Sequence, residues 1–188
     1  MKTKRVFFFT IDTNINMESF TITNTSHEDI PFICWMFDEA ILYQQKNKYP
    51  VWNGYDIDVI KSDIKQKIQY KIVIENEIAC IFSVCSNDPI IWGEKDKDSA
   101  IYLHRIVVNP KQKGKKQFEK IFEWAKKYCE EKNIDYIRMD TWANNPNIIK
   151  YYCSFGFNFL SNFTTPNTNN LPIQHRNISL ALLEFPII

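Results

Sequence analysis

Apolar residues in the first part of the chain recur at spacings that predict two helices and three strands. A capping-type sequence at residues 25–29 precedes helical periodicity over residues 30–45, and a shorter amphipathic helix is predicted over residues 57–67. Short β-prone stretches predict strands at residues 19–23, 70–74 and 78–84, the last two joined by a tight turn at residues 75–77.

Strands and helices alternate in the second part of the chain. Residues 101–108 are strongly apolar and β-prone, which predicts a central strand buried on both faces and ended by Asn109-Pro110. Apolar side chains then form one continuous helix face from Phe118 to Cys129. Further strands are predicted at residues 136–141, 157–163 and 178–185, a helix from residue 145 to Gly156, and a polar surface loop at residues 87–99.

This interleaved order favours one mixed sheet covered by helices. The chain has 188 residues, the length of an ordinary single domain. Met17 opens a more typical domain start, so residues 1–16 are interpreted as an N-terminal extension and residues 17–188 as the domain.

Charge and cysteine content narrow the function classes. The net charge of +1 gives no global attraction to nucleic acid or to an anionic membrane, and no apolar run approaches transmembrane length. Five cysteines without a C-x-x-C pair argue against a disulfide framework and a zinc site. Reduced thiols fit a cytoplasmic protein, and we expect no metal, nucleic-acid or membrane partner.

A lysine-rich turn before the predicted long helix is the most informative stretch, at residues 111–118. A helix N-terminus carries unpaired N–H groups and a partial positive charge, so lysines there are electrostatically misplaced. They make sense where an anion such as a phosphate binds. A solvated basic loop is the alternative interpretation.

A second motif runs from Asn145 to Phe157. Asn145 and Pro146 are suited to begin a helix, and Gly156 is suited to end it. Ile148, Tyr152 and Phe155 share one face, which directs the Tyr152 hydroxyl toward the sheet. Tyr152 is either a functional hydroxyl or a core aromatic.

Together, the strand ending V-V-N-P, the Gly/Lys turn, the helix, the next strand and N-x-x-x-x-x-Y-Y-x-x-x-G-F resemble the GNAT acetyltransferases, over residues 101–159. The resemblance implies an α+β domain whose mixed, mostly antiparallel sheet of six to seven strands is flanked by helices. It implies acetyl-CoA as acyl donor, with Tyr152 as the acid for the departing thiolate. The implied cofactor-binding residues are Val108, Lys113, Gly114, Lys115, Lys116, Gln117, Phe118 and Asn145.

The turn departs from the family pattern R/Q-x-x-G-x-G/A at two positions. Lys116 stands where a glycine is expected, and Phe118 stands where a small residue is expected. Glycine permits close approach of the backbone to phosphate, whereas the added lysines strengthen the attraction electrostatically.

The implied reaction is direct acetyl transfer to an amine. His104 is the candidate base because its titration lies near neutrality, with a structural sheet histidine as the alternative. His104 is an even number of residues from Ile106 and Val108, so its side chain lies on the same face of the strand as theirs unless a bulge inverts it. His175 and Arg176 follow the loop between the last two strands and are candidate substrate-binding residues.

The acceptor is expected to be a small-molecule or peptide amine, and a homodimer is compatible with this function. The alternative from another class is a non-catalytic acyl-CoA-binding or regulatory protein that keeps the fold.

Overall fold

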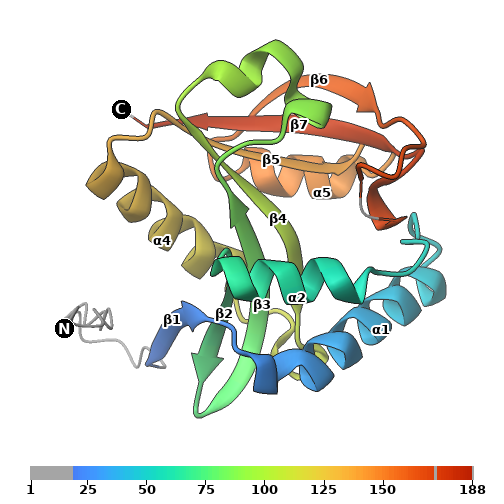
Figure 1. Cartoon of the computed structure of the whole chain (residues 1–188), viewed down its shortest axis with the longest axis vertical. Helices are drawn as coiled ribbons and strands as arrows, with labels where there is room; N and C mark the ends of the chain where they lie inside the picture. The colour runs from blue at the N-terminus through green and yellow to red at the C-terminus, as the bar shows by residue number, and fades with distance from the viewer. Residues whose placement is uncertain (1–18, 172, 188) are drawn as a thin grey trace.

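The computed structural model describes residues 19–171 and 173–187, so the predicted extension at residues 1–16 lies outside the described residues. The helices and strands follow the predicted order closely (Figure 1). They are β1 (Phe20–Asn24), α1 (Ile30–Lys46), α2 (Ile57–Gln66), β2 (Gln69–Ile74), β3 (Glu77–Cys85), α3 (Pro89–Trp92), β4 (Ala100–Val108), α4 (Gln117–Lys132), β5 (Tyr136–Trp142), α5 (Pro146–Cys153), β6 (Asn158–Thr164) and β7 (Ser179–Pro186).

The seven strands form one sheet in the order β1-β2-β3-β4-β5-β7-β6. Among the described strands, only β4 and β5 pair in parallel, and the other neighbours are antiparallel. The predicted α+β class with a mixed, mostly antiparallel sheet is therefore confirmed. The parallel register covers Ala100–Leu103 against Tyr136–Met139, so both strands continue beyond the last pair and separate there.

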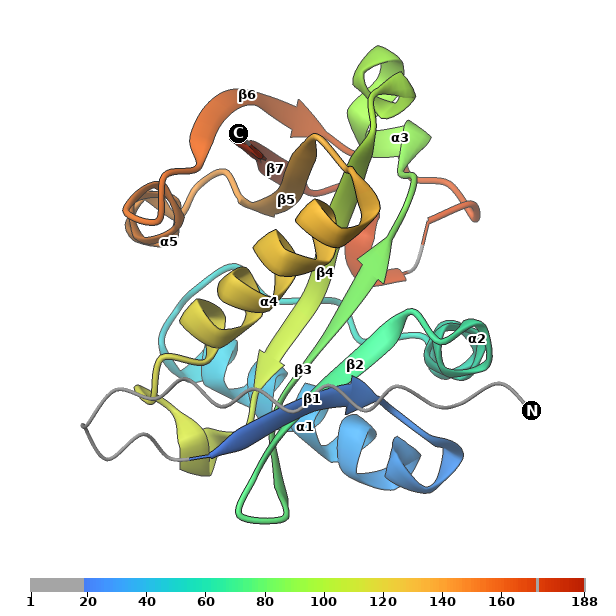
Figure 2. The same ribbon diagram turned by 90° about the vertical axis from the view of Figure 1, so that its left-hand side faces the viewer.

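Helices cover both faces of the sheet. The apolar faces of α4 and α5 pack on one side, where Ile121, Phe122 and Ala125 contact buried residues of β2 to β5 and β7. The opposite side is covered by α1 and α2, whose buried residues pack on Ile81 and Val107. Figure 2 shows α4 and α5 on one side of the strands and α2 and α3 on the other.

The central strand β4 contains a bulge at Arg105, which has φ of +50°. Ser83 pairs with His104 and Ile81 with Val107, so one residue of β3 lies opposite two residues of β4. As a result His104 lies on the opposite face from Ile106 and Val108, the inversion that a bulge was expected to cause.

The predicted polar loop at residues 87–99 is wrong in part, because it contains α3 and a 3₁₀ turn at Gly93–Lys97. The helix has only four residues, too few to show a periodicity. Its Ile91 and Trp92 are buried, and the loop is held to β5 by the buried Arg138, which ion-pairs with Asp98 and Glu184.

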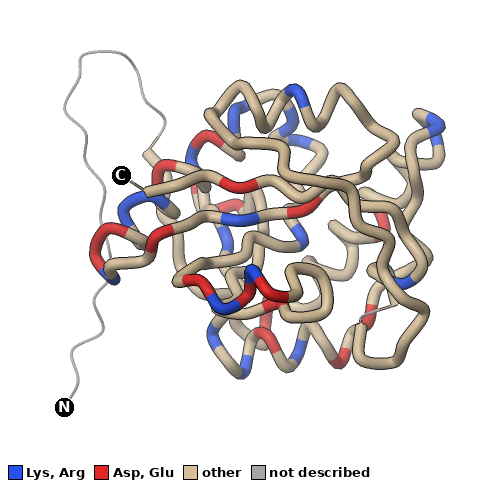
Figure 3. Tube along the Cα trace, turned by 90° about the horizontal axis from the view of Figure 1, so that it is seen from above, with Lys and Arg blue, Asp and Glu red and all other residues tan. Residues whose placement is uncertain are grey.

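Three further observations bear on the predicted class of protein. All five cysteines are free thiols, as expected. Across the described residues, none of the helices has the length and apolar character needed to cross a bilayer. Basic and acidic residues are interspersed along the chain in Figure 3.

Candidate active site

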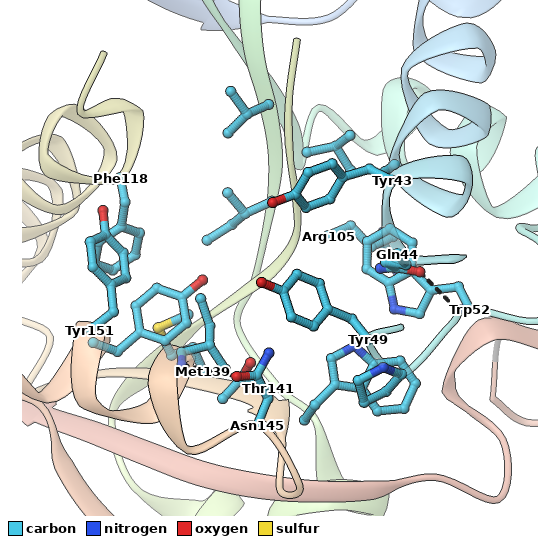
Figure 4. Close-up of a pocket in the computed structure, with 18 of the residues that line it drawn as sticks. Tyr43, Gln44, Tyr49, Trp52, Arg105, Phe118, Met139, Thr141, Asn145 and Tyr151 are labelled. Atoms are coloured by element: carbon cyan, nitrogen blue, oxygen red, sulfur yellow. Dashed lines mark hydrogen bonds between the residues drawn. The ribbon is translucent and has the colours of Figure 1, made fainter. Parts of the chain in front are cut away.

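A cavity of about 940 Å³ opens where β4 and β5 separate. Its walls come from the C-terminal halves of these two strands, from the turn before α4, from α5, and from the end of α1 with the loop that follows it. Because parallel pairing ends at Leu103 and Met139, the strands leave space that side chains from both layers line. Figure 4 shows Tyr43 and Tyr49 pointing into this space from one side, with Phe118 and Tyr151 on the other.

The turn before α4 is built around two residues with positive φ. Gly114 has φ of +80°, and a Cβ placed there would meet nothing within 4 Å. Lys116, at the N-cap of α4, is left-handed with φ of 55° and ψ of 41°. Left-handed backbone costs a non-glycine residue about 1–2 kcal/mol, which explains why glycine suits this position. Lys116 accepts the conformation and adds a cation beside the N–H groups of the first turn.

The lysines of the turn have different surroundings. Lys113 lines the cavity, and its Nζ lies 3.7 Å from the centre of the Tyr43 ring. Lys116 also lines the cavity and pairs with Glu119 at 3.2 Å across an exposed helix turn. Lys115 is not among the described residues that line the cavity, and its carbonyl accepts from Lys120 Nζ at 2.7 Å. The turn therefore presents two lysines, Gly114 and Gln117 to the cavity.

The unexpected Phe118 is accommodated by the core. Its side chain is 5% exposed and packs among the aromatic residues of α4 and α5. The ring lies 5.0 Å from Phe155 and 4.7 Å from Tyr152, edge-on in both cases. The large residue thus fills space between the two helices while still forming part of the cavity wall.

Asn145 begins α5 as predicted, because its Oδ1 accepts from Ile148 N at 3.3 Å. Seven residues later, Tyr152 is half-buried and lines the cavity, as does Val108 at the end of β4. Burial, followed by the proximity of Tyr151, Cys80 and Asp140, raises the pKa of Tyr152 above its usual range. Its phenol is therefore protonated at neutral pH. Tyr152 both packs on Phe118 and faces the cavity, so the two interpretations of it are compatible.

His104 lies between two carboxylates that the sequence did not associate with it. Its Nε2 is 3.3 Å from Asp88 Oδ2 and its Nδ1 is 3.4 Å from Asp140 Oδ1. A neutral imidazole has one ring nitrogen without a proton, and here that lone pair would face an anionic oxygen. Burial opposes the charged form, but the hydrogen bonds and charges of Asp140 and Asp88 outweigh it and raise the pKa of His104 to about 10. The ring is therefore an imidazolium at neutral pH.

This arrangement argues against the predicted role of His104 as the general base. A base must be free to accept a proton, and both nitrogens of His104 already carry one. The ligand atoms of Asp88, His104 and Asp140 lie within 4.8 Å of one another, as in a metal site. Because each ring nitrogen faces a different carboxylate, however, the geometry is that of a charged side chain held from both sides.

The two candidate substrate-binding residues differ in position. His175 is buried and lines the cavity, with its ring centre 6.0 Å from that of His104. Burial, together with the charge on His104, lowers the pKa of His175 to about 4, so it is neutral. Arg176 is not among the described residues lining the cavity. Its Nε donates to the Leu171 carbonyl at 2.7 Å, and its Nη1 donates to Asn169 at 3.1 Å, so it holds the loop together instead.

Several cavity residues come from parts of the chain where no motif was predicted. Tyr43, Tyr49 and Trp52 come from the end of α1 and the following loop, and Asp140 comes from β5. The available signal is the concentration of aromatic residues between Tyr43, in the last part of α1, and Tyr55 in the following loop. The sequence around Asp88 and Asp140 gives no indication of their role, because that role depends on the position of His104 in the folded sheet.

Comparison with known proteins supports the family predicted from the motifs. No family model matches the chain. It is 23% identical over 111 residues to the uncharacterized N-acetyltransferase YesJ of Bacillus subtilis, a match that covers 57% of this chain and 62% of the relative, less than two thirds of its length.

Solved structures match over a larger share of the chain. A GNAT-family acetyltransferase from Listeria monocytogenes superimposes with a TM-score of 0.72 at 19% identity, covering 89% of this chain and 94% of that one. The ribosomal-protein-S18-alanine N-acetyltransferase of Escherichia coli gives a TM-score of 0.62 at 13% identity, with the same coverage of 89% and 94%. The chain therefore has the GNAT acetyltransferase fold, and the resemblance indicated by its turn and helix motifs is confirmed.

Proposed function

We propose that this protein is an N-acetyltransferase that moves the acetyl group of acetyl-CoA to a primary amine by direct transfer. One observation carries the proposal: a single cavity joins the lysine-bearing start of α4, Tyr152 of α5, and Asp140 at the fork of the sheet, the point where β4 and β5 separate. The lysine-bearing turn is suited to bind a phosphate-bearing donor, the tyrosine to act as an acid, and the carboxylate to hold a cationic acceptor. The similarity to YesJ and to N-acetyltransferase structures agrees with this activity.

The residues of the turn fit a pyrophosphate. Gly114 leaves open space in front of the backbone, and Lys113 and Lys116 bring two cations to the N-terminus of a sixteen-residue helix. Acetyl-CoA supplies the activated acetyl group. In this proposal the phosphates of acetyl-CoA bind at the turn, and Val108 and Asn145 contact the extended arm of the cofactor farther into the cavity.

Tyr152 is the proposed acid. Its raised pKa keeps the proton on the phenol oxygen at neutral pH, and it can donate that proton to the sulfur as negative charge develops there. Its ring is fixed by the edge contact with Phe118, which limits the directions that the hydroxyl can take.

The acceptor amine must lose a proton during the reaction, and His104 cannot take it. His175 is the cavity imidazole whose lowered pKa leaves it neutral, although the same shift makes it a weak base. We therefore assign proton removal to His175 or to water in the cavity.

Calorimetry with coenzyme A tests the donor site. Binding should weaken as potassium chloride rises from about 50 mM to about 0.5 M, because ion pairing with phosphates is screened. Lys116→Gln should weaken binding, whereas Lys132→Gln, at the other end of α4, should not. Absence of binding at millimolar coenzyme A contradicts the proposal.

A second assay distinguishes an enzyme from a binding protein with the same fold. Thiol release from acetyl-CoA is followed in the presence of a panel of amines. Amine-dependent release supports the transferase. Coenzyme A binding without release for every amine supports the alternative, a non-catalytic acyl-CoA-binding protein.

A further inference from the structure

We infer that the fork end of the cavity selects an acceptor that enters as a primary ammonium with no carboxylate beside it, carried on an apolar or aromatic arm. The inference rests on the proposed function, because it names the substrate class of that same site. Asp140 is the residue that would hold the ammonium, and the Asp88–His104–Asp140 group, called here the fork cluster, supplies the charge.

The fork cluster has one negative charge more than it has positive charges. His104 contributes one cation and lies between the two carboxylates of Asp88 and Asp140. The nearby Arg105 does not supply the balance, because it is paired with Asp63, which also accepts from Ser83 Oγ at 3.1 Å. His175, the other imidazole in contact with the cavity, is neutral.

The excess charge is enclosed rather than solvated. The side chains of Asp88 and Asp140 are 13% and 10% exposed. Asp88 Oδ2 and Asp140 Oδ1 both face His104, at 3.3 and 3.4 Å, and no other donor among the described residues reaches either oxygen. Buried anions are stabilised when donors satisfy their oxygens, and an ammonium brings three donors and one positive charge.

Asp140 faces the cavity, so an incoming molecule can reach the fork cluster. Asp140 lines the cavity together with Thr141, immediately beyond the last parallel pair of the sheet. The proposed acid Tyr152 lines the same cavity, and the charge of Asp140 contributes to its raised pKa. An ammonium held by Asp140 is therefore near the point at which acetyl transfer is proposed.

Aromatic side chains form the wall on the α1 side. Tyr43 and Tyr49 direct their hydroxyl groups into the cavity in Figure 4, and Trp52 lies behind them. Trp52 is held in place, because its backbone N donates to Gln44 Oε1 at 2.9 Å and its ring lies 5.8 Å from Phe37. Such a wall suits an apolar or aromatic arm.

An acceptor with a carboxylate next to its amine is disfavoured at the same place. A second carboxylate would meet the excess negative charge of the fork cluster. Like charges brought together with little solvent between them give specificity by repulsion. Free α-amino acids are therefore excluded, whereas amines that lack the carboxylate are accepted.

Matched ligands test this selection by equilibrium binding, without requiring turnover. Calorimetry in the presence of coenzyme A compares 2-phenylethylamine with phenylalanine, which adds only a carboxylate, and with 2-phenylethanol, which lacks the positive charge. A second pair is 1,4-diaminobutane and ornithine. In at least one pair the amine should bind tenfold or more tightly than its amino acid, and 2-phenylethylamine should bind more tightly than the alcohol.

Two variants locate the effect. Asp140→Asn should remove the preference for the amine, whereas Glu39→Gln, which deletes a carboxylate from α1 in the same cavity, should change it less than twofold. Equal binding of amine and amino acid in both pairs, or no binding of either amine, overturns the inference even if Asp140→Asn fails to fold. Selective amine binding without thiol release would leave the inference standing and contradict the proposed transferase.

Discussion

Replacing His104 with Gln removes the cation from between Asp88 and Asp140 while keeping a polar side chain of similar length. Two buried carboxylates then lose their counter-charge. Breaking a buried ion pair by removing one partner costs about 3–5 kcal/mol. For a domain of this size, each kcal/mol shifts the melting temperature by roughly 2–4 °C, so His104→Gln should melt roughly 6–20 °C lower.

The pH dependence of stability gives a second, independent magnitude. The folded pKa of His104 is raised to about 10, above the value of about 6.5 expected in the unfolded chain. A raised folded pKa means that the stabilisation is complete below pH 6.5 and is lost as the pH rises through 10. For one proton, the contribution to the free energy of unfolding falls by about 2.5 kcal/mol between pH 7 and pH 9.

Thermal unfolding at a series of pH values measures this contribution. The wild-type melting temperature should fall by roughly 5–10 °C from pH 7 to pH 9 relative to His104→Gln, which lacks the titrating group. His27→Gln, at an exposed histidine, is the matched control and should keep the wild-type slope. Asp88→Asn retains one ion pair and should give a shallower slope if His104→Gln does not fold. Identical slopes in wild type and His104→Gln would refute the imidazolium.

Three further substitutions have distinct expected results. Tyr152→Phe should lower kcat by roughly 100-fold, the scale expected for loss of a general acid, and should leave coenzyme A affinity and melting temperature little changed. Tyr151→Phe is its control, and an unchanged kcat in Tyr152→Phe with a slow chemical step would rule out this acid. Phe118→Ala should cost about 3–5 kcal/mol in denaturant unfolding, because the ring is buried among aromatic side chains. Gly156→Ala should destabilise by about 1–2 kcal/mol, because φ is +95° and the new Cβ would lie 3.1 Å from Phe185, and unaltered stability would contradict that geometry.

Local patterns were sufficient for most of the fold. The apolar run of β4 and the periodicity of α4 predicted a buried central strand followed by an amphipathic helix, and both are present with nearly the expected limits. The Asn-Pro start of α5, and the turn at Gly156 that follows its last residue Cys153, also reflect side-chain and backbone preferences of single residues. Such features depend on neighbours in sequence, so one sequence suffices to predict them.

The fork cluster could not be predicted in this way. Its members come from the segment before α3, from β4 and from β5, and their meeting depends on the register of the sheet. The bulge at Arg105 also reverses the side of the sheet on which the side chains at the end of β4 lie. A bulge has no reliable sequence signature when its left-handed residue is not glycine. From the sequence, His104 can be judged only by the ordinary titration of a histidine, whereas its neighbours in the fold determine its charge.

Lys116 shows how a departure from a family pattern changes the physics of a site. Glycine at this position would avoid the cost of left-handed backbone, but it loses about 0.5–1 kcal/mol of additional conformational entropy on folding, so the two residues differ little in stability. The exposed pair with Glu119 adds little more. What changes is the approach to an anion, since the side chain limits close contact with the backbone while its charge, with that of Lys113, attracts from farther away. Binding that relies on charge more than on backbone contact is screened by salt. The strength of the salt dependence therefore measures how much of the anion binding at this turn comes from the lysine charges rather than from close backbone contact.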